Sequence, residues 1–123
     1  DYRENVLKIG RDFRRVISRY RRDGYKIVGY GAAAKGMTFL NFTNIKPDVI
    51  IDDNELKQNL YTPGTNVVIK PNGFLKQYKE HDKILFVPLA WNFYDEIRKR
   101  ILKVRDNKND KFLRYFPSVK VEN

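Results

Sequence analysis

Residues 25–36 read YKIVGYGAAAKG, and the expected fold depends on this stretch. Its first half is rich in β-branched and aromatic residues, which is typical of a buried strand. The glycines and alanines that follow fit the spacing G-x-G-x-x-G/A, from Gly29 through Gly31 to Ala34. In α/β proteins this pattern marks a tight turn from a strand into a helix whose free amide groups attract phosphate. We therefore expect a phosphate-type loop at Gly29–Gly36 that opens a small nucleotide-binding-like domain.

Hydrophobic patterns on both sides of this loop alternate between helix and strand. Helices are expected at 1–23, 32–42, 72–78 and 92–104, and strands at 25–30, 47–52, 67–69, 83–87 and 111–116. Such alternation implies right-handed crossovers and a parallel sheet. The predicted fold is α/β, a Rossmann-like three-layer sandwich with a mainly parallel sheet of about five strands, preceded by an N-terminal amphipathic helix.

The 123 residues are expected to form one domain, with a leading helix at 1–24, an α/β core at 25–117 and a tail at 118–123. The chain starts at Asp1, and we expect it to be the C-terminal part of a longer protein. It has no cysteine, which excludes disulfides and thiolate metal sites. No apolar run approaches the roughly 18 residues of a membrane span, so we expect a cytoplasmic protein without a membrane partner.

A formal net charge of +10 leaves two interpretations open. One is an anionic partner such as nucleic acid or a phosphorylated ligand, and the other is a solvated exterior rich in basic residues. The charge is scattered along the chain, although the leading helix carries six arginines between residues 11 and 22. Nucleic-acid binding is therefore kept only as an alternative.

Two aspartates, Asp52 and Asp53, end the second strand about twenty residues after the loop, where a dinucleotide site places its ribose-binding acid. This arrangement is compatible with a stand-alone NAD(P)- or nucleotide-binding module. Alternatively, the glycines serve only the strand-to-helix turn.

Three blocks together resemble the C-terminal domain of SAM-dependent sugar C-methyltransferases, which methylate a ring carbon of nucleotide-linked deoxysugars. They are GYGAAAKG at 29–36, DDNELKQNLYTPGT at 52–65 and WNFYDEI at 91–97. The resemblance implies that an upstream module binds zinc and that a middle domain binds SAM and performs the chemistry. This chain would hold the nucleotide-sugar (dTDP-, UDP- or GDP-linked), would bind no cofactor itself and would not be catalytic alone. The methyltransferase would act in cis, or in trans as a separate protein.

The resemblance also implies a substrate-binding surface at the carboxyl edge of the sheet. The first block would lie near the diphosphate, through Gly29, Gly31, Ala32, Ala33, Lys35 and Gly36. The later blocks would contact ribose or base, cover the ligand or line the edge, through Asp53, Asn54, Lys57, Tyr61, Thr62, Trp91 and Asn92. No catalytic residue and no metal ligand is expected.

Several of these positions have a structural alternative. The segments 54–58 and 61–64 are also typical of turns, and Trp91 is more typical of an anchor for the last helix than of a stacking platform. The acidic pair Asp95 and Glu96 begins a helix, where carboxylates stabilise the helix dipole.

Overall fold

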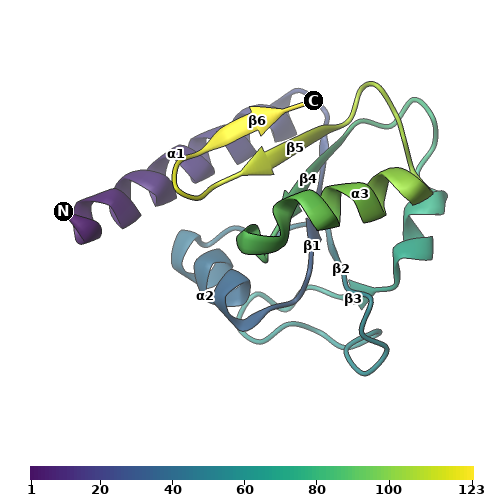
Figure 1. Ribbon diagram of the computed structural model, residues 1–123, viewed down its shortest axis with the longest axis horizontal. Coiled ribbons are helices and arrows are strands. Elements are labelled where there is room, and N and C mark those ends of the chain that lie inside the picture. The colour runs from purple at the N-terminus through teal and green to yellow at the C-terminus, as the bar shows by residue number, and fades with distance from the viewer.

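The computed structural model describes residues 1–123 as a sheet enclosed by helices (Figure 1). The helices are α1 (Tyr2–Arg22), α2 (Ala34–Thr43) and α3 (Tyr94–Val104), with the 3-10 turns η1 (Asn72–Gln77) and η2 (Trp91–Phe93). The strands are β1 (Lys26–Tyr30), β2 (Val49–Ile51), β3 (Ile69–Lys70), β4 (Ile84–Pro88), β5 (Lys111–Arg114) and β6 (Lys120–Glu122). The predicted α/β fold with a mainly parallel sheet is confirmed.

The six strands form one sheet in the order β3-β2-β1-β4-β5-β6. The neighbours among β1 to β5 are parallel, and β6 is antiparallel to β5. Strand order reverses between β1 and β4, which is the switch point where open α/β sheets form a crevice. The crevice therefore lies between the segments that follow these two strands.

The sixth strand lies in the segment that was expected to be a tail, and it adds to the five strands that were expected. Residues 120–122 pair with β5, and the half-buried Val119 and Val121 pack against the core. A three-residue Lys-Val-Glu strand has no hydrophobic pattern of its own, so the exposed edge of β5 determines its conformation.

Each face of the sheet has its own apolar cluster, which produces the three layers seen in Figure 1. On one face α1 and α2 contribute Phe13, Ile17 and Leu40, all fully buried. On the other face α3 contributes Ile97 and Ile101 to a cluster around Phe86. The leading helix is thus part of the core.

Part of the segment between β2 and β3 is extended. The Asn59 N–H donates to the Ile69 carbonyl at 2.7 Å, and the Ile69 N–H donates to the Leu60 carbonyl at 2.9 Å. Tyr61 forms an antiparallel bridge with Val68. Residues 59–62 therefore run antiparallel to β3 and cover that edge of the sheet. They lead away from the carboxyl end of β3.

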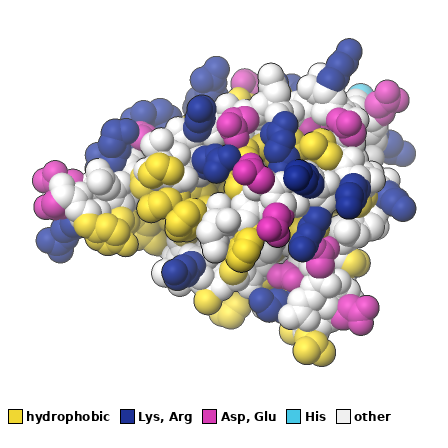
Figure 2. Space-filling view, viewed as in Figure 1, with side chains coloured by type: hydrophobic (Ala, Val, Ile, Leu, Met, Phe, Trp, Pro, Cys, Tyr) yellow, Lys and Arg dark blue, Asp and Glu magenta, His cyan; other side chains and the backbone are white.

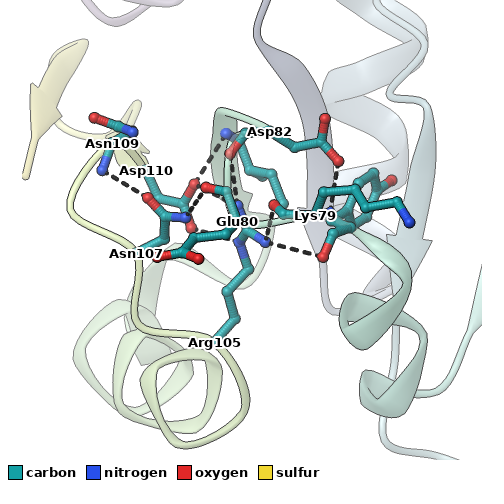
Figure 3. A network of polar contacts seen from close by, with 9 residues as sticks. Lys79, Glu80, Asp82, Arg105, Asn107, Asn109 and Asp110 are labelled. Carbon is teal, nitrogen blue, oxygen red and sulfur yellow. Dashed lines mark hydrogen bonds and ion pairs between the residues drawn. The ribbon is translucent and has the colours of Figure 1, made fainter.

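At the amino ends of the strands, a buried ion pair joins α3 to the segment before β4 (Figure 3). The Arg105 guanidinium lies 2.8 Å from the Asp110 carboxylate and donates to the carbonyls of Lys79 and Asp82 at 3.1 and 2.7 Å. Asp110 also accepts the Ile84 N–H at 3.0 Å, at the first residue of β4. The hydrogen bonds of this network join the end of α3 to the segments that precede β4 and β5.

No helix is long and apolar enough to cross a membrane.

Candidate functional site

The β1–α2 connection begins with a turn that requires glycine. Gly31 has φ +90°, a conformation that side chains with a Cβ rarely adopt. Its N–H donates to the Ile51 carbonyl at 2.7 Å, and the next N–H, that of Ala32, donates to the Asp52 carboxylate at 2.7 Å. Two of the loop amides that a phosphate could use are therefore bonded within the protein.

Helix α2 still presents free amides beyond these two. Its first turn donates no hydrogen bond until the Met37 N–H reaches the Ala33 carbonyl at 3.0 Å, and Ala33 makes no side-chain cap. Lys35 lies in this turn and is exposed. The positive end of the helix dipole and Lys35 together favour an anion here.

Two glycines of the loop pattern are needed for close packing. A Cβ on Gly36 would lie 2.6 Å from the Leu89 Cβ and 2.9 Å from its carbonyl oxygen. A Cβ on Gly29 would lie 3.1 Å from side-chain atoms of both Ile50 and Leu89. These two positions hold α2 and β4 close to β1, and a ligand role for either stays a prediction.

A cavity of about 290 Å³ opens at the switch point, between the carboxyl ends of β1 and β2 and the start of α3. Its walls are Tyr30, Gly31, Asp52, Asp53, Ala90, Phe93, Glu96, Ile97 and Arg100. The topology predicts a ligand at this position. Of the residues that were expected to bind a ligand, Gly31 and Asp53 line the cavity.

The Asp53 carboxylate is held from two sides. The Tyr30 hydroxyl donates to it at 2.9 Å, and Arg100 Nη1 lies 3.1 Å from its Oδ2. Burial, and then the hydrogen bond to Asp53, raise the pKa of Tyr30, so this hydroxyl stays a donor over the whole physiological range. These two contacts orient the Asp53 carboxylate, and the Asp53 side chain remains 37% exposed.

Asp52 lies where a dinucleotide site places its ribose-binding acid, but its carboxylate bonds to backbone amides of the protein. Its carboxylate accepts the Ala32 and Asn54 N–H groups at 2.7 and 2.8 Å, so it ties the loop after β1 to the loop after β2. Lys57 reinforces this tie by donating from Nζ to the Ala32 carbonyl at 3.0 Å. The Asn54 side chain accepts the Leu56 N–H at 3.0 Å, as in a turn.

Tyr61 and Thr62 lie apart from this cavity. Tyr61 is exposed on the strip that covers β3, and Thr62 is buried in the following turn. The Thr62 hydroxyl contacts the Thr65 hydroxyl and accepts the Val67 N–H at 3.0 Å. Their contact with a ligand stays a prediction, and the structure gives Thr62 a role in the turn.

Trp91 and Asn92 line a second, smaller hollow of about 210 Å³ that shares Phe93 and Glu96 with the main cavity. The Trp91 ring is 4.3 Å from that of Phe116 and packs against the core. These contacts hold Trp91 against the segment between β5 and β6, and its role as an anchor for the last helix stays a prediction.

Apart from Asp52, which the dinucleotide interpretation named, six cavity residues were not among the predicted site residues: Tyr30, Ala90, Phe93, Glu96, Ile97 and Arg100. Phe93 and Glu96 belong to the third sequence block, WNFYDEI, so their proximity to two named positions was the available signal. Arg100 follows Glu96 by one helical turn, and only the packing of α3 on the sheet brings it to Asp53.

Comparison with protein-family models matches residues 1–117 to the C-methyltransferase C-terminal domain. The chain belongs to this family. A search of curated proteins finds no match. The C-methyltransferase C-terminal domain thus includes α1 and all five parallel strands, and the family resemblance inferred from the three sequence blocks is confirmed.

No group of three or more His, Cys, Asp or Glu side chains is arranged to hold a metal ion. Two carboxylates of the cavity of this C-methyltransferase C-terminal domain are already bonded within the protein. That of Asp52 accepts backbone amides, and that of Asp53 contacts a tyrosine hydroxyl and an arginine.

Proposed function

We propose that this domain binds the nucleotide-linked sugar of a C-methyltransferase while a separate SAM-binding domain transfers the methyl group. The observation that carries the proposal is the cavity at the switch point between β1 and β4, with the oriented Asp53 carboxylate on its wall. The family description supports the enzyme class, because the chain is the C-terminal domain of such a protein. Carboxyl-edge crevices of open α/β sheets are the usual position of nucleotide ligands.

The ligand's diphosphate is placed outside the cavity, at the start of α2. Lys35 is exposed there, and the amides of the first turn have no partner within the helix. Gly31 lines the cavity and leads directly into this turn, so one ligand spans both. Lys57 supports the same loop from its Ala32 carbonyl.

The methyl transfer itself is assigned to another domain. We identify no set of nucleophile, base and acid at this edge, and Asp52, Asp53 and Lys57 are engaged in hydrogen bonds within the protein. SAM supplies the methyl group when it is bound by that other domain, and this chain contributes binding and orientation of the acceptor.

A stand-alone NAD(P) module is less well supported. In that alternative Asp52 would bind a ribose, but its two carboxylate oxygens each accept a backbone N–H of the protein. Nucleic-acid binding would need a continuous basic surface. The face shown in Figure 2 has none, because Asp and Glu side chains lie among the Lys and Arg side chains.

Isothermal titration tests the proposal, with dTDP-, UDP- and GDP-linked sugars added to this domain together with its SAM-binding domain. We expect saturable binding of at least one of them, and a several-fold loss of affinity in Lys35→Met. Lys46→Met removes an exposed lysine at the far end of α2 and should leave the affinity unchanged. Absence of binding by all three sugars, or a saturable fluorescence change with NADH alone, would overturn the proposal.

A further inference from the structure

We infer that the first two turns of α1 form a docking surface for the SAM-binding domain. We call this part of the helix, residues 2–9, the overhang, because it projects past the sheet (Figure 1). The inference rests on the proposed function, which assigns methyl transfer to a separate domain, and it names the surface through which that domain is held. None of these residues lines the ligand cavity.

The apolar side of α1 continues beyond the core that the helix helps to form. Its apolar residues recur at intervals of three or four and therefore lie along one side of the helix, at Tyr2, Val6, Ile9, Phe13 and Ile17. Phe13 and Ile17 are fully buried, whereas Tyr2 is 81% exposed and Val6 is partly exposed. The overhang thus carries the apolar pattern of a packed helix into a region that this domain does not fully cover.

The overhang extends from the carboxyl edge of the sheet. The Phe13 ring is 5.8 Å from the ring of Tyr115, which directly follows β5. The Tyr115 hydroxyl donates at 2.9 Å to the carbonyl of Leu89, which directly follows β4. Phe13 therefore lies beside the carboxyl ends of both strands, and α1 runs from there toward the amino end of β1. The residues before Phe13 extend past this edge, and a rise of about 1.5 Å per residue places Tyr2 about 16 Å farther along the helix axis.

Exposed aromatic side chains continue this apolar surface from the overhang toward the cavity. Phe42, near the end of α2, is 46% exposed and packs on Gly10 of α1. Phe116 is 38% exposed, and its ring lies 4.3 Å from that of Trp91, the first residue of η2. Figure 2 shows hydrophobic side chains gathered on this part of the molecule, at the left of the view. Contiguous exposed apolar surface of this kind marks an interface with another protein.

The charge of the molecule indicates the chemistry of the partner. A second copy of this chain also carries a formal net charge of +10, so two copies repel each other. Arg3, Arg11 and Arg14 are exposed on or next to the overhang, and they favour a partner with acidic groups around an apolar patch. A lipid surface requires a long apolar helix face, but from Phe13 onward this face is occupied by the core.

The reaction identifies which protein this partner is. The chain is the C-terminal domain of a C-methyltransferase, and the proposed function places the methyl donor on another domain. That domain has to reach an acceptor held at the carboxyl edge of the sheet. The overhang and Phe116 stand on the same edge, so a domain that covers them is brought to the side of the molecule on which the acceptor is bound.

Photo-cross-linking tests the inference in the protein that contains both domains, in one chain or as a complex. In the variant Tyr2→p-benzoylphenylalanine we expect cross-links to peptides of the folded SAM-binding domain, and not only to the segment that joins the two domains. The matched control is His81→p-benzoylphenylalanine. The His81 side chain is 84% exposed and precedes β4, at the opposite edge of the sheet, so it should give no cross-link to that domain.

Substitution of the overhang should impair methyl transfer and spare ligand binding. In the double variant Tyr2→Ser, Val6→Ser we expect the rate of methyl transfer to fall about tenfold, with an unchanged calorimetric affinity for the nucleotide-sugar, because only the contact between domains is lost. Both side chains are at least partly exposed in this domain, so its fold is retained. Leu7→Ser is the control, since Leu7 is 46% exposed but lies about 100° around the helix from Val6.

The outcomes separate the inference from the proposed function. Cross-links from position 2 only to a second copy or to membrane lipid, equal yields from positions 2 and 81, or an unchanged rate in the double variant would overturn the inference. If nucleotide-sugars bind but position 2 does not cross-link to the SAM-binding domain, the inference is wrong and the proposed function stands. If that cross-link forms while no nucleotide-sugar binds, the docking surface stands and the sugar-binding function fails.

Discussion

Gly36 lies where helix α2 crosses the segment that follows β4. A Cβ at this position would approach the Leu89 backbone oxygen to 2.9 Å, closer than real Cβ contacts come. Gly36 lies two residues beyond Ala34, the last position of the G-x-G-x-x-G/A pattern, and close packing on Leu89 explains why this position is glycine.

Substitution of Gly36 should therefore destabilise the protein. In Gly36→Ala we expect the free energy of unfolding to fall by about 1–3 kcal/mol, the usual cost of an added group in a packed interior. Urea unfolding followed by circular dichroism measures the change.

Gly73→Ala is the control for this prediction, since a Cβ there meets no atom within 4 Å. Its stability should stay within about 0.5 kcal/mol of the unsubstituted protein. Equal effects of the two substitutions would contradict the packing argument.

Asp52 shows, at the same scale, what sequence reasoning misses. Its position at the end of β2 predicts a ribose contact, and residue type and spacing agree with that prediction. The Asp52 carboxylate bonds to the amides of Ala32 and Asn54, whereas that of Asp53 contacts the side chains of Tyr30 and Arg100, and both residues line the cavity. A hydrogen bond between loops twenty residues apart has no local signature, so sequence could not distinguish the two aspartates.

At the scale of elements, the junction of α3 with the strands depends on Arg105 and Asp110. The exposed fractions of their side chains are 8% and 3%, and Arg105 also satisfies backbone carbonyls of the segment before β4 (Figure 3). Both residues stand in the polar stretch RDNKND at 105–110, for which the sequence made no prediction.

Removal of Arg105 should be costly, because it leaves the Asp110 carboxylate buried without its counter-charge. We expect Arg105→Ala to lower the free energy of unfolding by about 3–5 kcal/mol. Lys103→Ala, on the exposed side of the same helix, should change it by less than about 0.5 kcal/mol. Chemical denaturation of both variants in parallel provides the measurement, and a small effect at Arg105 would show that the pair does not secure this junction.

The elements themselves were largely predictable. The five parallel strands and the three main helices were located from their hydrophobic patterns, with ends that differ by a few residues. The patterns are strong there because each element buries one or both faces. The strip at 59–62 and strand β6 were not predicted, since both owe their conformation to pairing with an exposed sheet edge.

In the whole molecule, the leading helix α1 contributes more to the hydrophobic core than the C-terminal strand β6 does. Helix α1 projects past the sheet at its N-terminal end, yet it places Phe13 and Ile17 in the core with no exposed surface (Figure 1). Strand β6 has no fully buried residue and pairs with a single neighbour.

Truncation should reveal this difference. Deletion of residues 1–24 removes two fully buried side chains, each worth about 3 kcal/mol or more, so we expect loss of cooperative unfolding. Deletion of residues 118–123 should preserve a cooperative transition with a lower midpoint. Near-ultraviolet circular dichroism during urea titration distinguishes the two outcomes, and a folded chain without α1 would contradict the assignment of this helix to the core.

The sequence by itself determined the α/β class, the order of most elements and the family, because these depend on hydrophobic periodicity and on motifs that are local in the chain. The residues at 29–36 also correctly indicated a tight strand-to-helix turn. The tertiary structure decided which amides of that turn remain free, which aspartate ties the two loops together, and that Tyr30, Phe93 and Arg100 line the same cavity. The physical reason is that each of these outcomes depends on contacts between segments brought together only when the sheet and its two helical layers assemble.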